Sequence, residues 1–181
     1  LCLSASHPSP PPLVVALILN WNGCADTLAC LESLQQQTYP ALVPLVVDNG
    51  SSDGSAVAIR AAFPGVHLIE TGANLGFCAG NNVGLEWALA QGADYVLMLN
   101  NDTWFDPAMT SELVAAANDD PAIGLAGPKI YQAAPPHVLW SAGGAVTFWG
   151  NVTAMRGFRQ ADHGQYDTAA DVDYLPGCGI L

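Results

Sequence analysis

Four short segments of the chain concentrate side chains that can hydrogen-bond a ligand or hold a metal ion. Each is rich in Asn, Asp, Gly or Ser, and together they are Asn20-Trp21-Asn22-Gly23, residues 48–54 (DNGSSDG), residues 71–77 (TGANLGF) and Asn100-Asn101-Asp102. Carboxylate and amide oxygens are ligands for hard cations, and glycine-rich turns expose backbone N–H groups that bind phosphate. One such loop is typical of ordinary turn chemistry, but four in one chain indicate a binding site.

Apolar segments that predict strands and helices alternate with these loops. Residues 13–19 (LVVALIL) are continuously apolar, which is typical of a parallel strand covered on both faces. The pattern predicts strands at residues 13–19, 45–47, 66–69 and 95–99, and helices at residues 26–38, 55–63, 81–91 and 106–117. This order predicts an α/β fold with a mostly parallel central sheet flanked by helices. Each polar loop then follows a strand, at the sheet edge where ligands bind in such folds.

The two ends of the chain differ from the rest in composition and pattern. Residues 1–12 are rich in proline and have no basic stretch, so they predict a loose tail rather than a signal peptide. After residue 120, Gly-Gly and Pro-Pro pairs separate short strand candidates at residues 124–126, 138–140, 145–148 and 172–175. We therefore expect a single domain over residues 13–181, with a mixed and irregular C-terminal part.

The composition limits the partners of the chain. Four Lys and Arg stand against 16 Asp and Glu, which gives a formal charge of −12. Four cations are too few for a nucleic-acid footprint or a polybasic membrane patch, so we expect no nucleic-acid partner. Five cysteines without a C-x-x-C pair favour buried, free thiols in a reducing, cytoplasmic compartment. An anionic ligand would have to be held by something other than many Lys and Arg.

Two common nucleotide-binding motifs do not occur in the sequence. No G-x-G-x-x-G follows the first predicted strand, and G-x-x-x-x-G-K-[ST] occurs nowhere. The sequence therefore disfavours a dinucleotide-dependent oxidoreductase and a P-loop nucleotide hydrolase.

Five segments follow one another in an order that resembles a known family. They are Asn20-Trp21-Asn22, residues 37–40 (QTYP), residues 46–55 (VVDNGSSDGS), residues 74–77 (NLGF) and residues 99–103 (LNNDT). Together they resemble the family 2 inverting glycosyltransferases of the GT-A fold, and most of all the rhamnosyltransferase-like bacterial members. The resemblance implies a nucleotide-binding part at residues 13–120 and the start of an acceptor part at residues 121–181. It also implies inverting transfer of a sugar from a nucleotide-diphosphate donor to a glycan or lipid-linked acceptor, in a parent protein peripheral to the inner face of the membrane.

The same resemblance implies roles for individual residues. Asp48 and Asn49 match the loop that holds the nucleotide base and ribose, with Asn49 where many relatives have a second acid. Asn100 and Asp102 match the D-x-D motif that holds Mg²⁺ or Mn²⁺ against the donor diphosphate, with Asn100 in place of the first acid. The full set expected to bind nucleotide and donor is Asn20, Asn22, Asp48, Asn49, Ser51, Asn74, Gly76, Phe77, Asn81, Asn100, Asn101 and Asp102.

Two assignments have two interpretations each. Asn81 and Asn82 either open a helix whose free N–H groups favour anions, or serve only as capping residues. Trp140, Gly143 and Gly144 lie on the acceptor side if the resemblance holds, or else only form a hairpin.

The catalytic base is the part of the expected site that these residues do not supply. The resemblance places this carboxylate in an acidic segment after a strand similar to residues 175–181, so we expect it beyond Leu181, since Asp171 and Asp173 precede that strand. A last strand without its continuation predicts an exposed sheet edge and self-association. A chain that binds a nucleotide sugar without turnover is the alternative function. A nucleotidyltransferase fits less well, because residues 20–23 contain no Lys or Arg.

Overall fold

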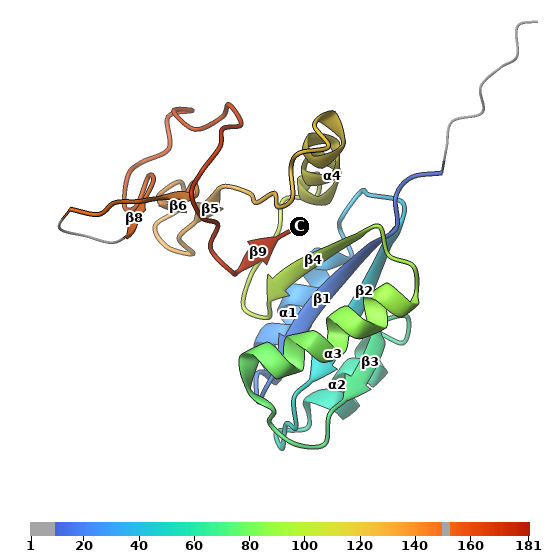
Figure 1. Cartoon of the computed structure of the whole chain (residues 1–181). Helices are drawn as coiled ribbons and strands as arrows, with labels where there is room; N and C mark the ends of the chain where they lie inside the picture. Colours follow the sequence, from blue (N-terminus) through green and yellow to red (C-terminus); the bar gives the residue numbers. More distant parts are fainter. Residues whose placement is uncertain (1–9, 150–152) are drawn as a thin grey trace, which may run out of the picture.

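A five-stranded sheet forms the centre of the computed structural model, which describes residues 10–149 and 153–181 (Figure 1). The strand order is β3-β2-β1-β4-β9. The strands are β1 (Val14–Asn20), β2 (Leu42–Asp48), β3 (His67–Glu70), β4 (Tyr95–Asn100) and β9 (Gly179–Ile180). Strands β1 to β4 are parallel, and β9 pairs antiparallel with β4. The carboxyl ends of the parallel strands therefore meet at one edge, where Asn20 lies opposite Asp48.

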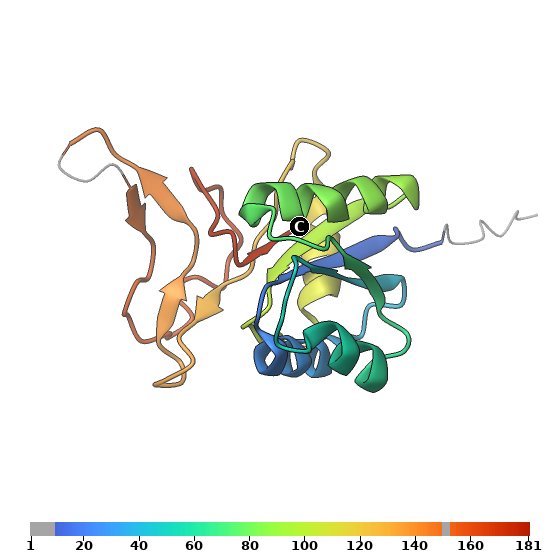
Figure 2. The same ribbon diagram turned by 90° about the horizontal axis from the view of Figure 1, so that it is seen from below.

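Helices cover both faces of this sheet, as the turned view shows (Figure 2). They are α1 (Cys24–Leu34), α2 (Ser55–Ala62), α3 (Gly76–Ala90) and α4 (Met109–Asp119). Strand β1 is fully buried from Val14 to Ile18, and its side chains alternate between the two faces. Ala16 and Ile18 join the core beneath α1, α2 and α4, whereas Val15 and Leu17 join the core beneath α3. The continuous apolar run in the sequence is explained by these two cores.

Helix α3 approaches the sheet closely because it carries glycine where it crosses β1. A Cβ atom on Gly84 would lie 2.2 Å from Leu17 Cδ1, and one on Gly80 would lie 2.7 Å from Leu19 Cδ1. Both distances are shorter than any ordinary carbon contact, so a larger side chain at either position would require the helix or the facing leucine to shift. The close approach holds the start of α3 beside the carboxyl end of β1.

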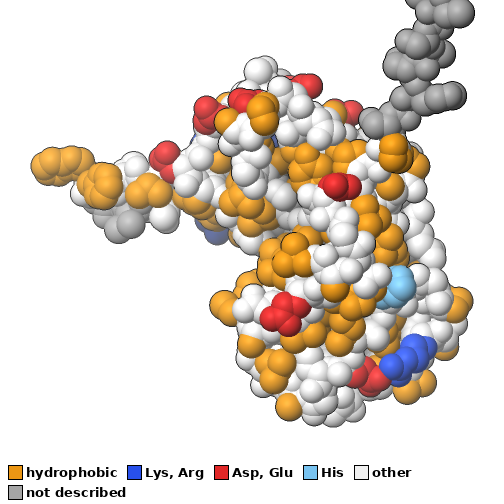
Figure 3. All heavy atoms as spheres, turned by 45° about the vertical axis from the view of Figure 1, so that its right-hand side comes forward, with side chains coloured by type: hydrophobic (Ala, Val, Ile, Leu, Met, Phe, Trp, Pro, Cys, Tyr) orange, Lys and Arg blue, Asp and Glu red, His pale blue; other side chains and the backbone are white. Residues whose placement is uncertain are grey.

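The C-terminal part forms an arm that extends away from the sheet (Figure 1). It contains two small antiparallel pairs, β5 (Ile130–Tyr131) with β6 (Leu139–Ser141), and β7 (Gly144–Val146) with β8 (Thr153–Met155). Hydrophobic side chains lie at the far end of the arm in the space-filling view (Figure 3), where Phe148 and Trp149 are 94% and 93% exposed. The chain then returns to the sheet at β9, and Leu181 exchanges two backbone hydrogen bonds of 2.9 Å with Ala126.

The predicted order of strands and helices through α4 is confirmed, with several corrections. Helix α3 begins at Gly76 rather than residue 81, and α1 ends at Leu34 rather than near residue 38. The strands predicted at residues 124–126 and 172–175 are wrong. These segments make only isolated backbone pairs, such as the bridge from Tyr174 to Gly144, and no continuous ladder. The predicted N-terminal tail lies mostly outside the described residues.

The cysteines only partly follow the prediction of buried thiols. Cys30 is buried, Cys24 and Cys178 are partly buried, and Cys78 is exposed; these four are free, and Cys2 lies outside the described residues. Within residues 10–149 and 153–181, no helix is long and apolar enough to cross a membrane.

Candidate functional site

Asn20, the last residue of β1, joins three of the four polar loops. Its side chain is fully buried, and its Nδ2 donates hydrogen bonds to Asp48 Oδ2 at 2.9 Å and to Ser51 Oγ at 3.1 Å. Its Oδ1 accepts from Thr27 Oγ1 at 2.8 Å and from Asn101 Nδ2 at 3.4 Å. Because a buried amide with partners on both atoms fixes the groups around it, Asn20 sets the relative positions of the loops after β1, β2 and β4.

The loop after β2 is held by its own first residue. The Asp48 carboxylate is 2% exposed and accepts the Ser51 backbone N–H at 2.8 Å. Asn22 adds a second tie, because its Oδ1 accepts the Ser52 N–H at 2.8 Å and its backbone N–H donates to Ser51 Oγ at 2.9 Å. These bonds give the loops after β1 and β2 one shared conformation.

Asn49 ties the loop after β2 to the loop after β3. Its side chain is 2% exposed; Nδ2 donates to Asn74 Oδ1 at 3.1 Å, and Oδ1 accepts the Leu75 N–H at 3.0 Å. Asn74 Oδ1 in turn accepts the Gly76 N–H at 2.8 Å, at the first residue of α3. In this conformation the Asn49 side chain therefore positions the loops, and its carbonyl oxygen is occupied by a backbone N–H.

The segment after β4 divides its side chains between the protein interior and a cavity. Asn101 turns inward, and its Nδ2 donates to Thr27 Oγ1 at 3.1 Å. None of the described residues donates a hydrogen bond to the side chains of Asn100 or Asp102. A cavity of about 240 Å³ lies here and is lined by Leu19, Phe77, Asn81, Met98, Leu99, Asn100, Asn101, Asp102 and Gly177. The oxygens of Asn100 and Asp102 are thus available to a ligand or ion.

The start of α3 forms one wall of this cavity, which corrects the expectation for Asn81. Asn81 lies in the second turn of the helix, is 5% exposed, and donates from Nδ2 to the Phe77 carbonyl oxygen at 2.9 Å. It does not open the helix. The N–H groups without helical partners belong instead to the first turn, which begins at Gly76.

No cation lines the 240 Å³ cavity, although all four Lys and Arg residues are described. Arg60 pairs with Glu70, and Lys129 pairs with Asp162 and Asp167. Arg156 lies over the Tyr166 ring and Arg159 over the Phe158 ring. A diphosphate in this cavity would therefore have its charge compensated by groups other than Lys and Arg.

The two cysteines near the end of β4 remain protonated at neutral pH. Burial raises the pKa of Cys30 to about 12, and its Sγ lies 3.6 Å from the Asn100 carbonyl oxygen. Burial also raises the pKa of the Cys178 thiol. Since the thiolate is the nucleophilic form, neither residue suits covalent catalysis.

The oxygens at the end of β4 fit a divalent cation that shares its coordination with a ligand. The part of the chain that the structure describes contains no group of three or more His, Cys, Asp or Glu side chains that could hold a metal alone. Asp102 and Asn100 offer one carboxylate and one amide oxygen. Mg²⁺ commonly uses one or two carboxylates and completes its shell with phosphate oxygens and water. These residues therefore fit Mg²⁺ or Mn²⁺ in the presence of a diphosphate.

The predicted acceptor residues lie away from this cavity. Gly143 and Gly144 are buried in the arm, where a Cβ on Gly144 would lie 2.1 Å from Tyr174 Cζ. Neither they nor Trp140 line the 240 Å³ cavity or the cavity of about 700 Å³ on the other side of Asp102. Asp173 accepts the Val146 N–H at 2.8 Å in the same arm. The described geometry thus shows hairpin packing for these residues.

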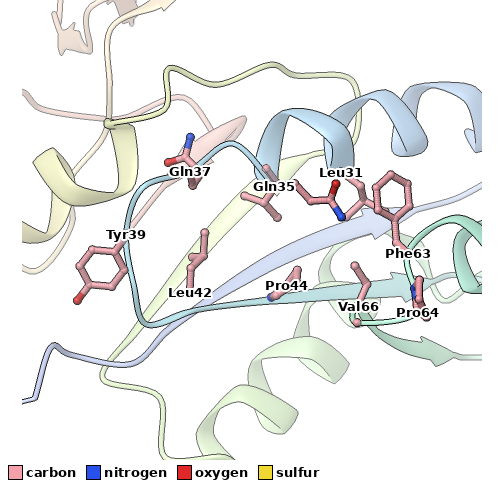
Figure 4. Close-up of a pocket in the computed structure, with 11 residues that line it drawn as sticks. Leu31, Gln35, Gln37, Tyr39, Leu42, Pro44, Phe63, Pro64 and Val66 are labelled. Atoms are coloured by element: carbon pink, nitrogen blue, oxygen red, sulfur yellow. The ribbon is translucent and has the colours of Figure 1, made fainter.

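A separate hollow lies at the opposite edge of the sheet, between α1 and the start of β2 (Figure 4). It has a volume of about 390 Å³ and apolar walls that include Leu42, Pro44 and Phe63, and its lining contains no carboxylate, Lys or Arg. The polar chemistry of the chain is therefore concentrated at the carboxyl ends of the strands.

A mostly parallel sheet with polar loops at its carboxyl edge and a mixed C-terminal part is the arrangement expected of the GT-A fold, and comparisons with known proteins agree. The model of the family described as Glycosyl transferase family 2 matches residues 16–166. The chain belongs to this family.

Two curated relatives each match 55% of the chain. The N-acetylglucosaminyl-diphospho-decaprenol L-rhamnosyltransferase of Mycobacterium tuberculosis is 35% identical over 112 residues, which cover 55% of this chain and 35% of that protein. The uncharacterized glycosyltransferase YibD of Escherichia coli is 31% identical over 103 residues, which cover 55% and 29%. The chain thus spans about a third of the length of these relatives.

Solved structures of two glycosyltransferases share the fold. The mannosyltransferase PcManGT of Pyrobaculum calidifontis, in complex with GDP-Man and Mn²⁺, has a TM-score of 0.61 at 22% identity, over 69% of this chain and 37% of that one. The 1–349 portion of S. aureus TarS has a TM-score of 0.60 at 16% identity, over 93% and 46%. The GT-A fold predicted from the sequence is confirmed.

Proposed function

We propose that this chain is the donor-binding part of a glycosyltransferase that moves a sugar, with inversion, from a nucleotide diphosphate to an acceptor. The observation that carries the proposal is the pair of unengaged side chains, Asn100 and Asp102, in a cavity without Lys or Arg. Solved relatives of the same fold are described as complexes with GDP-Man and Mn²⁺ and with UDP-GlcNAc, which supports a nucleotide-sugar donor.

Different residues of this chain would bind different parts of the donor. The loop that begins at Asp48 would take the nucleoside, and the first turn of α3 would direct its free N–H groups at the diphosphate. Asn100 and Asp102 would hold Mg²⁺ or Mn²⁺, and such an ion stabilises the negative charge of a diphosphate leaving group. Asn20 and Asn49 act indirectly, because their buried amides fix the loops that carry these groups.

The acceptor belongs to the same proposal. The mycobacterial relative is named for an N-acetylglucosaminyl-diphospho-decaprenol substrate, which supports a lipid-linked acceptor and a parent protein at the inner face of the membrane. A glycan acceptor fits the same family. The base that takes the acceptor proton is proposed to lie beyond Leu181. Self-association through the β9 edge is also proposed, although Leu181 already pairs there with Ala126.

Calorimetric titration of this chain with UDP, TDP and GDP sugars, in the presence of Mn²⁺, tests the proposal. We expect saturable binding of at least one of these donors. If no donor binds, the donor-binding function is wrong. Transfer by a longer protein that includes the residues after Leu181, but not by residues 1–181, would support a base in that region. No transfer by either protein would favour nucleotide-sugar binding without turnover.

A further inference from the structure

A larger cavity lies on the other side of Asp102 from the proposed diphosphate position. It has a volume of about 700 Å³ and is formed by the loop after β4, the segment around β5, and the residues before β9. Asp102 and Leu99 line both cavities. A molecule in the larger cavity would therefore border a donor in the smaller one, and the volume suits a small ligand.

Two aromatic side chains line the larger cavity and remain accessible. Trp104 is 67% exposed and Tyr131 is 43% exposed. An exposed tryptophan offers a large, rigid apolar face, which packs well against a flat or weakly polar partner. The C–H face of a pyranose ring has this character. The carboxylate of Asp106 and the amide of Gln132 also line the cavity and could bond sugar hydroxyl groups.

The charge of this cavity is unfavourable for a phosphate. Lys129 is its one cation, but Lys129 Nζ already donates to Asp162 Oδ2 at 2.8 Å and to Asp167. Asp102 and Asp106 add two further carboxylates to the lining. Asp162 and Asp167 already balance Lys129, and Asp102 and Asp106 leave the lining with a net negative charge when no metal ion is bound, so an anion would be repelled. A neutral ligand would not be repelled by this charge.

We propose that the 700 Å³ cavity holds a neutral pyranose ring of the acceptor, stacked on Trp104, and that any phosphate of the acceptor stays outside it. This inference rests on the proposed glycosyltransferase function, because only a transferase needs a second sugar beside Asp102. It assigns Trp104 and Tyr131 to acceptor recognition, a role for which the sequence indicated only Trp140, Gly143 and Gly144.

Saturation-transfer NMR on this chain, with no added metal, tests the inference. The probes are methyl α-L-rhamnopyranoside, methyl N-acetylglucosaminide and N-acetylglucosamine 1-phosphate. We expect transfer to the ring protons of at least one neutral glycoside and binding of the phosphate weaker by about tenfold. Trp104→Ala should weaken glycoside binding by about tenfold, and Trp104→Phe should retain most of it because a flat aromatic face remains.

Trp149→Ala is the matched control, since Trp149 is also an exposed tryptophan but lies at the far end of the arm. Its glycoside binding should equal that of the wild type. Glycoside binding unaffected by Trp104→Ala, no glycoside binding at all, or stronger binding of the 1-phosphate would each overturn the inference. Donor titration with Mn²⁺ on the same samples separates the two proposals. If the donor binds and the glycosides do not, only the acceptor inference fails; if the donor does not bind, the proposed function fails.

Discussion

Asparagine side chains, more than charged side chains, fix the conformation of the loops at the site. Asn20, Asn49 and Asn101 all direct their side chains into the protein, where they bond neighbouring loops. Of the polar side chains expected to bind nucleotide and donor, only those of Asn100 and Asp102 have no partner among the described residues. The structure therefore separates residues that position the loops from residues that face the cavity, a distinction that the family motif alone does not make.

Asn20→Ala tests the positioning role. The change removes the donor to Asp48 and the acceptor of Thr27, and it leaves buried polar groups without partners. We expect the free energy of unfolding to fall by about 1–3 kcal/mol, and nucleotide affinity to fall with it because the loops lose their register. Urea denaturation and calorimetry measure the two effects. Asn118→Ala removes only an exposed bond to Tyr95 and should change stability much less; equal losses in both variants would contradict this role.

The sequence predicts which residues lie at the site better than it predicts which way their side chains point. Each polar loop does follow a strand, because apolar runs such as residues 13–19 fix the strand ends. The burial of Asn49 could not be predicted, since it depends on where the Leu75 N–H lies after folding. Thr27 was missed altogether. Its position four residues after Gly23, on the inner face of α1, was the one available indication.

At the scale of the element, the glycines of α3 allow this helix to lie close to the sheet beside the site. The segment at residues 71–80 (TGANLGFCAG) contains Gly and Asn residues that are typical of a loop, and this composition explains why the helix start was predicted five residues too late. Helical geometry persists there because Gly80 and Gly84 allow the helix to lie directly on Leu19 and Leu17. The packing energy of the interface outweighs the low intrinsic helix propensity of glycine.

Gly84→Ala tests this packing. Its new Cβ would lie 2.2 Å from Leu17 Cδ1, so the helix or the leucine must move. We expect a loss of about 1–3 kcal/mol in the free energy of unfolding, measured by urea denaturation. Asn82→Ala is the control on the exposed face of the same helix and should be neutral or slightly stabilising. A Gly84→Ala variant as stable as the wild type would show that α3 does not pack as described.

The C-terminal arm is the element that the sequence predicts least. Its strands have two or three residues each, and their partners are fixed by contacts distant in the chain, such as Val138 with Ala161. Hydrophobic alternation needs longer segments to be informative. The 700 Å³ cavity was missed for the same reason, because it forms only where the segment around β5 folds against the loop after β4.

The ion cluster of the arm makes stability depend on pH. Hydrogen bonding to the Lys129 ammonium, then to the Tyr131 hydroxyl, holds the pKa of Asp162 well below its usual range. A lowered pKa stabilises the fold above the unfolded value of about 3.9, and this contribution is lost as the pH falls through the folded value. We expect Lys129→Met to lower the urea midpoint at pH 7, with a difference from the wild type that shrinks below about pH 4.

The control for this prediction is Arg60→Met, which breaks the exposed pair with Glu70. Exposed pairs contribute little, so its midpoint should change less at pH 7. A difference between Lys129→Met and the wild type that stays constant from pH 7 to about pH 3 would show that Asp162 is not stabilised by this pairing.

For the whole molecule, the main question is how a chain with four cations and 16 acids could bind a diphosphate. The structure places every Lys and Arg outside the 240 Å³ cavity. It brings the oxygens of Asn100 and Asp102 to that cavity, beside the free N–H groups of α3. A divalent cation would then supply the positive charge that the side chains lack.

The Mn²⁺ dependence of nucleotide binding tests this account most directly. Calorimetry would use whichever of UDP, TDP and GDP binds the wild-type chain best, with Mn²⁺ and with a chelator. We predict that Mn²⁺ tightens binding by at least about tenfold, that Asp102→Asn abolishes the gain, and that Asp119→Asn, the same change on the exposed end of α4, leaves it intact. Wild-type binding that is indifferent to Mn²⁺, or an Asp102→Asn variant that keeps the full gain, would contradict it.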